Sequence, residues 1–402
     1  ITMKELGDRW AEHIARTMRR PAAAIVAVLA LALVAGCGQR ATEARLLLDD
    51  IAAGYGPSEL KAATPAPYRR AVSWTIDGRP GDGHLYTNGV EALGRLVLVP
   101  GLSEQGIDDS RLVALAQSLT RARFVVLVPD LARLRQFRVA ATDAREIADA
   151  AAALATMAVP EAAPGPVGVA AVSYAVAPAV LAALEPDMTD TVAFVVGIGG
   201  YHDIVAAVTY VTTGRYRDGP DAPWRTGRPN PAAKWWFAEL NAYRLGDPAD
   251  RDGLTAIARR RRTDPAAAID DLLARLGPDG RAMLALLENT DPDATPALIA
   301  ALPRRLQADF SALSPATRDL TRLRARLILI HGRDDPAIPA TESVALAAAV
   351  PDGHADLYVL GGLDHVDLLK RPGLFDRLAL WRASCAVLAE RDRIVPADAV
   401  LR

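Results

Sequence analysis

Three short segments of this chain carry side chains that could together activate a hydroxyl group. Ser173 lies at the centre of AVSYA (171–175), Asp335 lies in HGRDDPAIP, and His365 lies in GGLDHVDL. A serine hydroxyl is a poor nucleophile at neutral pH, so it needs a base within hydrogen-bond reach and a carboxylate that orients that base. We therefore expect Ser173 to act as a nucleophile, His365 as its base and Asp335 as the orienting acid.

The segments around Ser173 predict a sharp turn from a strand into a helix. The apolar run GPVGVAAV precedes the serine and YAVAPAVLAAL follows it. A nucleophile held in such a turn needs small residues two positions before and two positions after it, and Ala171 and Ala175 stand there. The spacing of small residues around a serine is common by chance in an alanine-rich chain, so the prediction of this turn depends on the elements around it.

Those elements predict an α/β fold. Buried runs on both sides of an amphipathic helix, as in the segment 94–130, indicate parallel strands joined by a right-handed crossover. Parallel sheets place their sites at the carboxyl ends of the strands, where all three candidate residues fall. Eight segments have strand character: AVSWTI, GHLYT, RLVLVP, RFVVLVP, GVAAV, VAFVVGI, RLILI and DLYVL. The first two are expected to be antiparallel, joined by a long turn over 77–83.

With its order of Ser173, Asp335 and His365, the chain resembles the α/β-hydrolase superfamily from about Val72 to its C-terminal helix. The resemblance implies a mostly parallel eight-stranded sheet with helices on both faces and a serine hydrolase activity, without a metal or an organic cofactor. The family pattern Gly-x-x-Asp before a proline falls on Asp335, and the neighbouring Asp334 remains an alternative.

The same resemblance implies an oxyanion hole. Pro100-Gly101-Leu102 is similar to the His-Gly-x turn of these hydrolases, with proline in place of histidine. The backbone amides of Leu102 and Tyr174 would then face the developing oxyanion. An ordinary strand-to-helix turn at 100–102 is the alternative.

The stretch between the strands that end near Ile198 and begin near Arg326 is far longer than a crossover helix requires. Insertions at this point commonly form a helical cap over the catalytic edge. Tyr201, Trp235 and Trp236 are candidate pocket residues, and packing in the cap's own core is the competing role of each. We expect an N-terminal extension and signal peptide (1–36), a helix and linker (37–70), the first core part (71–199), the cap (200–322) and the second core part (323–402).

Charge gives no indication of nucleic-acid binding, since 46 Lys and Arg face 48 Asp and Glu for a net charge of -2. The run of arginines at 259–262 could attract an anionic surface. The nearby Asp264, Asp270 and Asp271 favour a solvated helix face instead.

The N-terminal region has the design of a signal peptide. A basic start precedes a 14-residue apolar stretch, 22–35. Such a helix spans about 21 Å, shorter than a bilayer core of about 30 Å. Its ending LVAGC resembles a bacterial lipobox, which implies lipidation of Cys37, a bilayer as partner, and an anchor in the cell envelope. Gly38 after the cysteine implies the outer membrane, facing the periplasm.

Four functions are compatible with these residues. The leading hypothesis is a lipid-anchored serine hydrolase that cleaves a carboxylic ester or a related small acyl compound through an acyl-enzyme. An acyltransferase or a peptidase could use the same residues. A non-catalytic binding lipoprotein with the hydrolase fold is the fourth. Its support is that Ala171 and Ala175 flank Ser173 where these hydrolases more often have glycine.

Overall fold

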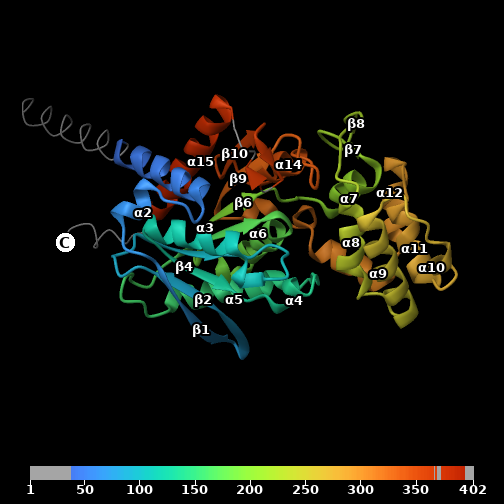
Figure 1. Cartoon of the computed structure of the whole chain (residues 1–402), viewed down its shortest axis with the longest axis horizontal. Helices are drawn as coiled ribbons and strands as arrows, with labels where there is room; N and C mark the ends of the chain where they lie inside the picture. The colour runs from blue at the N-terminus through green and yellow to red at the C-terminus, as the bar shows by residue number, and fades with distance from the viewer. Residues whose placement is uncertain (1–37, 366, 369–372, 394–402) are drawn as a thin grey trace, which may run out of the picture.

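The computed structural model describes residues 38–365, 367–368 and 373–393. Its centre is an eight-stranded sheet of order β1-β2-β4-β3-β5-β6-β9-β10 (Figure 1). Five successive pairings, from β4-β3 to β9-β10, are parallel. The strands are β1 (Tyr68–Ile76), β2 (Arg79–Thr87), β3 (Gly94–Leu98), β4 (Phe124–Pro129), β5 (Val167–Val172), β6 (Val192–Ile198), β9 (Arg326–Gly332) and β10 (Ala355–Leu360). All eight strands expected from the sequence are present, and the sheet is mostly parallel as predicted.

The connection between β1 and β2 is shorter than the sequence suggested. Ile76 pairs with Arg79, so Asp77 and Gly78 alone form the turn, and the expected loop 77–83 is mostly strand. Both turn residues have positive φ, at 47° and 77°. Asp-Gly is the sequence that two-residue hairpin turns of this type prefer, because the second residue has no Cβ to clash. The turn residues further along, Pro80 to Gly83, are instead paired with β1.

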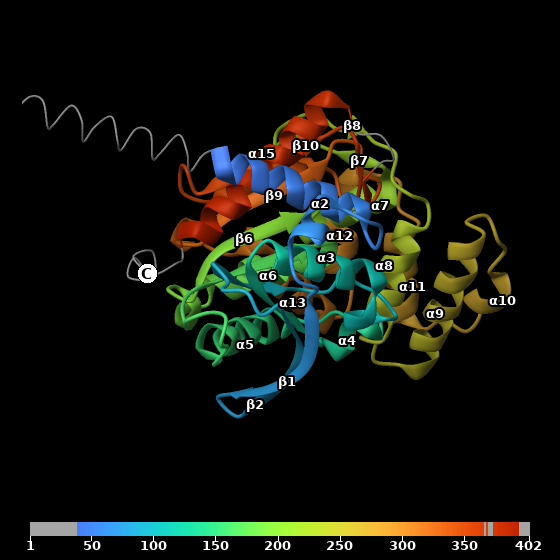
Figure 2. The same cartoon turned by 60° about the vertical axis from the view of Figure 1, so that its left-hand side comes forward.

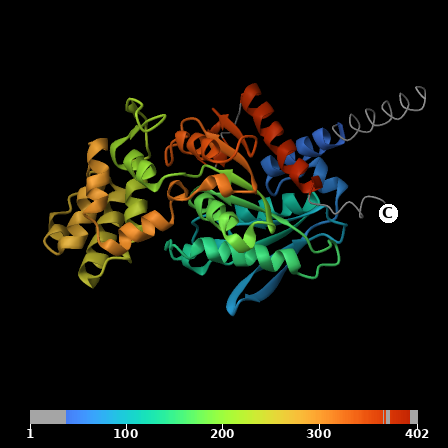
Figure 3. The same ribbon diagram turned by 180° about the vertical axis from the view of Figure 1, so that it is seen from behind.

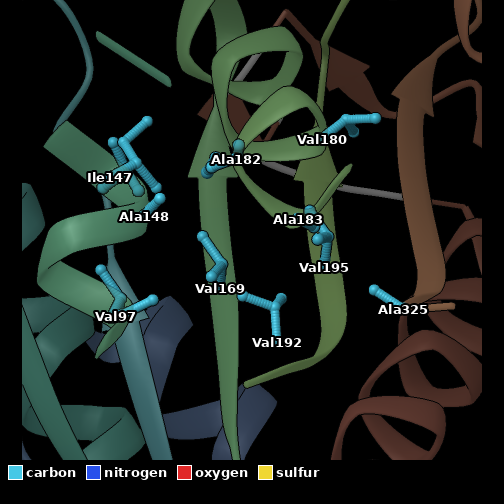
Figure 4. Close-up of a cluster of buried hydrophobic side chains, with 14 of the residues drawn as sticks. Val97, Ile147, Ala148, Val169, Val180, Ala182, Ala183, Val192, Val195 and Ala325 are labelled. Carbon is cyan, nitrogen blue, oxygen red and sulfur yellow. The ribbon is translucent and has the colours of Figure 1, made fainter. Parts of the chain in front are cut away.

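Helices cover both faces of the sheet, as expected. On one face, α5 (Asp143–Thr156), α6 (Val176–Leu184) and α14 (Thr341–Ala349) contribute to a buried apolar core. Figure 4 shows part of it, with Ile147 of α5 and Ala182 of α6 close to Val97 and Val169 of the central strands. The opposite face is covered by α3 (Ser110–Arg121), α15 (Leu374–Arg393) and the helix at 38–53. The short helices α2 (Glu59–Ala63) and α4 (Ala132–Arg135) lie in connections.

The stretch between β6 and β9 forms a helical unit with a core of its own. In Figure 1, and from behind in Figure 3, most of its helices form a separate lobe beside the sheet. Leu254, Met283 and Leu306 are among its fully buried side chains. Its elements are α7 (Ile204–Thr213), β7 (Arg215–Tyr216), β8 (Arg225–Thr226), α8 (Ala233–Ala242), α9 (Pro248–Thr263), α10 (Asp270–Leu273), α11 (Pro278–Leu287), α12 (Thr295–Ala300) and α13 (Arg304–Ala312).

The helix at 38–53 is packed against the C-terminal helix rather than peripheral (Figure 2). Ala44 and Leu47 are buried in the same apolar cluster as Leu388 of α15. The Trp381 indole donates a hydrogen bond to the backbone oxygen of Ala41 at 2.9 Å. The first described turn of the chain is therefore fixed to the domain that contains the sheet. Among the described helices, none combines the length and the apolar character that crossing a bilayer demands.

Candidate active site

Ser173 occupies a strained turn between β5 and α6. Its φ is 55°, in the left-handed region that costs a non-glycine residue roughly 1–2 kcal/mol. β5 ends at Val172, and residues 173–175 form a single helical turn that runs into α6 at Val176. Strain of this kind persists only where surrounding structure enforces it, as the buried strand and helix do here. The turn presents the serine hydroxyl at the carboxyl edge of the sheet.

Glycines in β6 and directly after it make room for Val176, where α6 begins. Ala171 and Ala175 are both 1 % exposed, and Ala171 pairs with Gly197 of β6. A Cβ on Gly197 would lie 2.7 Å from a Val176 methyl, and a Cβ on Gly200 would lie 2.3 Å from the Val176 Cβ. Real Cβ atoms do not approach so closely, so both glycines are needed for α6 to start directly above β6.

His365 is hydrogen-bonded to both of its expected partners. Its Nε2 lies 2.7 Å from the Ser173 Oγ, and its Nδ1 lies 2.7 Å from the Asp335 Oδ2. Because a carboxylate can only accept, Nδ1 carries the proton and Nε2 is free to accept from the serine. His365 follows the short strand β11 (Leu363–Asp364), which pairs with β12 (Asp367–Leu368), and its φ of 53° matches the positive φ of tight hairpin turns.

Both carboxylate oxygens of Asp335 accept hydrogen bonds. Its Oδ1 accepts from the backbone amides of Ala337 at 2.7 Å and Ile338 at 2.9 Å, which leaves Oδ2 for His365. The residue is 1 % exposed, whereas Asp334 is exposed. Burial alone would raise the pKa of the Asp335 carboxyl, but hydrogen bonds from the His331 and His365 rings outweigh it and hold that pKa well below its ordinary value. The structure thus brings Asp335, and not Asp334, to the histidine.

His331 is a second imidazole at Asp335, with a different set of partners. It is fully buried at the end of β9, and its Nδ1 lies 2.7 Å from the Ser343 Oγ. Its Nε2 lies 2.9 Å from the Ile338 carbonyl oxygen and 3.4 Å from the Asp335 Oδ2. Two acceptors at Nε2 place the proton there. His331 therefore holds the loop that carries the carboxylate.

A cavity of about 530 Å³ opens at the serine, between the sheet edge and the helical unit. That volume lies in the range of sites that enclose most of a small organic ligand. The core contributes Leu102, Phe137, Ser173, Tyr174 and His365, among others, and the described lining is mostly apolar. The 200–322 insertion contributes side chains from α7 and α8, so it closes one side of the cavity. These side chains include Ile204, Val208, Val211, Trp236, Phe237 and Leu240.

Both expected oxyanion-hole residues, Leu102 and Tyr174, border this cavity. Tyr174 also lies in the first turn after the serine, where helical backbone amides have no partner within the helix. Its side chain is fixed, since its hydroxyl donates to the Asp143 Oδ2 at 2.8 Å. Burial raises the pKa of this phenol well above its ordinary value, so it stays a hydrogen-bond donor at neutral pH.

Of the three aromatic residues expected in the pocket, Tyr201 and Trp236 line the cavity and Trp235 does not. Trp235 is 2 % exposed and packs in the core of the insertion. Neighbouring residues of a helix point about 100° apart, so α8 directs one indole inward and the other to the cavity. The ring centres of Trp236 and of Phe137, which lies outside the insertion, are 5.2 Å apart, with the rings tilted by 30°.

Contacts far apart in sequence hold the site together, and no sequence signal marked them. The Glu342 carboxylate accepts from the backbone amides of His202 and Asp203, where the insertion leaves β6. Burial raises the pKa of Glu342 to about 7. The Tyr210 hydroxyl of α7 donates to the backbone oxygen of Asp335 at 3.0 Å. The insertion therefore supports the position of the acid as well as closing the cavity.

The arginine run at 259–262 is a mostly paired helix face on α9. Arg260 forms an ion pair with Asp271, while Arg259 and Arg262 both pair with Glu239 of α8. Arg262 also lies 3.6 Å from the centre of the Trp236 ring.

Cys37, the expected lipidation site, lies outside the described residues. Within them, no group of three or more His, Cys, Asp and Glu side chains is arranged to hold a metal ion.

Comparison with known proteins yields matches of structure only. Neither the protein-family models nor the curated proteins include a match to this chain. A Legionella pneumophila protein assigned as a hydrolase is 13% identical, with 81% of this chain and 89% of that one covered and a TM-score of 0.51. The 2,6-dihydroxy-pseudo-oxynicotine hydrolase is 14% identical over 84% of this chain and 70% of its own, with a TM-score of 0.45. The dienelactone hydrolase of Anabaena variabilis is 16% identical over 82% of this chain and 100% of its own, at 0.41.

The sheet order, the helices on both faces and the Legionella structure agree on one architecture. The chain has the α/β-hydrolase fold.

Proposed function

We propose that this protein is a serine hydrolase that cleaves carboxylic esters or related acyl compounds through an acyl-enzyme. The observation that carries the proposal is the continuous chain of hydrogen bonds from Ser173 through His365 to Asp335, both at 2.7 Å. These two hydrogen bonds meet the geometric requirement for an activated hydroxyl nucleophile. The chain of hydrogen bonds ends on a mostly apolar cavity, which suits an organic acyl substrate.

In the proposed reaction, the Ser173 oxygen attacks the ester carbonyl while its proton passes to the His365 Nε2. The backbone amides of Leu102 and Tyr174 donate to the resulting oxyanion. The imidazolium then returns the proton to the leaving alkoxide, and the C–O bond of the ester breaks. Water repeats the sequence on the acyl-enzyme, with His365 again as base. The Asp335 carboxylate stays ionised throughout and stabilises the imidazolium, in line with its lowered pKa.

The test is steady-state hydrolysis of 4-nitrophenyl acetate, butyrate and octanoate by the full chain in detergent. The proposal predicts saturable turnover that falls by at least ~10³-fold in Ser173→Ala. Ser103→Ala is the matched control, since this hydroxyl is in the neighbouring loop and bonded to Gln105 and Asp109. Turnover that survives Ser173→Ala, or that is absent from a folded wild-type protein, would exclude this function.

We also propose that the protein is anchored in the cell envelope of a bacterium through lipid on Cys37. Support comes from the LVAGC motif at the end of a 14-residue apolar stretch. Metabolic labelling with an alkyne fatty acid, followed by membrane fractionation, tests the anchor. Label and membrane association should both be lost in Cys37→Ser, whereas Cys385→Ser should retain them.

A further inference from the structure

The cavity contains one permanent charge among its described lining residues. Arg244, two residues after α8 ends, lines the cavity and is only 3 % exposed. No Asp or Glu is among the described residues that line the same cavity. A cation on the wall of an otherwise apolar cavity is unexpected, because burying a charge is costly unless another charge compensates it.

The described partners of Arg244 are mainly neutral oxygens. Its Nε donates to the Tyr243 hydroxyl at 3.2 Å and its Nη1 donates to the Asn241 Oδ1 at 2.9 Å. Its Nη2 donates to the backbone oxygen of Val139. A guanidinium has five N–H groups, so these three bonds leave one on each terminal nitrogen. The nearest carboxylate contact is the Asp309 Oδ2, 3.5 Å from Nε and on the side of the group already bonded to Tyr243.

The charge of Arg244 reaches the residues beside the nucleophile. Burial is the main cause of the raised pKa values of Tyr174 and Tyr201, and Arg244 opposes the rise in both. Tyr174 follows Ser173 directly, and both tyrosines line the cavity. Asp143, the acid next to Tyr174, is occupied by the Tyr174 hydroxyl and by Arg133. Asp143 acts on both phenols in the opposite sense and more strongly, and Arg244 offsets part of its effect from the cavity wall.

We propose that Arg244 binds a carboxylate on the substrate, so that the enzyme acts preferentially on esters whose acyl part carries a carboxylate at its far end. This inference rests on the proposed function and names its substrate class. The two remaining N–H groups of the guanidinium can be donated to carboxylate oxygens, and the negative charge of the substrate adds to that of Asp309 in compensating the buried cation. The apolar walls, including Phe237 and Leu240, pack against the methylene groups between the carboxylate and the ester.

The experiment compares matched esters that differ by one charge. Mono-4-nitrophenyl esters of succinate, glutarate and adipate are measured beside the same compounds with the free carboxylate methylated, on the full chain in detergent. The proposal predicts that kcat/KM for at least one free acid exceeds that for its methyl ester by more than ~10-fold. Arg244→Gln should abolish this ratio, and Arg244→Lys should retain part of it. Arg138→Gln is the control, because this exposed arginine also lies over the Tyr243 ring but does not line the cavity.

Binding measured without catalysis separates this inference from the proposed function. In Ser173→Ala, monomethyl glutarate should bind at least ~10-fold more tightly than dimethyl glutarate by calorimetry, and adding Arg244→Gln should remove the difference. Hydrolysis of every methyl ester as fast as of its free acid, with no difference in binding, would overturn the anion site and leave the hydrolase. Absence of all hydrolysis with carboxylate binding intact would overturn the hydrolase and keep the site.

Discussion

Replacing Asp335 by asparagine is the most informative single substitution, because the structure determines how the new amide must lie. The position of Oδ1 receives two backbone N–H groups, from Ala337 and Ile338. An amide nitrogen there would face two donors, so the asparagine carbonyl oxygen must take this place. The NH₂ group then takes the place of Oδ2, 2.7 Å from the His365 Nδ1.

A donor at that position reverses the hydrogen-bonding roles of the two ring nitrogens of His365. Nδ1 must become an acceptor, the proton moves to Nε2, and Nε2 can no longer accept from Ser173. A triad held in the wrong tautomer loses on the order of 10⁴-fold in kcat. At ~1.36 kcal/mol for each tenfold, this loss equals about 5.5 kcal/mol of transition-state stabilisation.

The assay is kcat on 4-nitrophenyl butyrate at pH 8 for wild type, Asp335→Asn and Asp334→Asn. The second variant has the same chemical change on the exposed neighbour. Its kcat should remain within threefold of the wild-type value. A kcat within tenfold of wild type for Asp335→Asn, or an equal loss in both variants, would show that Asp335 does not set the tautomer of His365.

Three further changes test the support of the site. Gly199→Ala should lower kcat/KM at least ~10-fold, because its Cβ would lie 3.3 Å from the His365 Nδ1 at a φ of +62°. Gly353→Ala is the control: its φ is +76° and its Cβ would meet no atom within 4 Å, so this variant should lose stability without losing activity. Tyr210→Phe removes the hydrogen bond to the backbone of Asp335 and should lower the free energy of unfolding by about 1 kcal/mol, measured in urea. Glu342 has a folded pKa of about 7, raised from 4.5 by burial, so its contribution to stability is present below pH 4.5 and is lost as pH rises towards 7. Above pH 7, Glu342→Gln should therefore raise the free energy of unfolding relative to wild type by up to about 3 kcal/mol, and at pH 4.5 it should leave this free energy nearly unchanged. An equal difference at both pH values would contradict the burial argument.

The sequence was sufficient for the sheet and for the three residues at its edge, because both depend on local patterns. Buried strands are continuous apolar runs, and the strand ends of a parallel sheet meet at one edge. Ser173, Asp335 and His365 are each adjacent to such an end, so their convergence follows once the strands are placed. The choice between Asp334 and Asp335 needed the structure, since it depends on which side of a loop is buried.

The insertion was predictable as a unit but not in its detail. Most of its helices are short, and its apolar side chains divide between an internal core and the cavity. No periodicity distinguishes Trp235 in the core from Trp236 in the cavity, because both are large, apolar and adjacent. Arg244 and Glu342 acquire their roles from partners more than 100 residues away, which only tertiary structure brings together.

Reaction of the full chain with a fluorophosphonate probe, followed by peptide mass spectrometry, tests whether Ser173 is an activated nucleophile. An activated serine attacks the phosphorus and keeps the adduct, whatever the natural substrate is. We expect one adduct per chain on Ser173, none in Ser173→Ala, and labelling slowed at least ~100-fold in His365→Ala, where the general base is absent. An adduct at another residue, equal labelling of both variants and wild type, or no labelling of a folded wild-type protein would contradict this expectation.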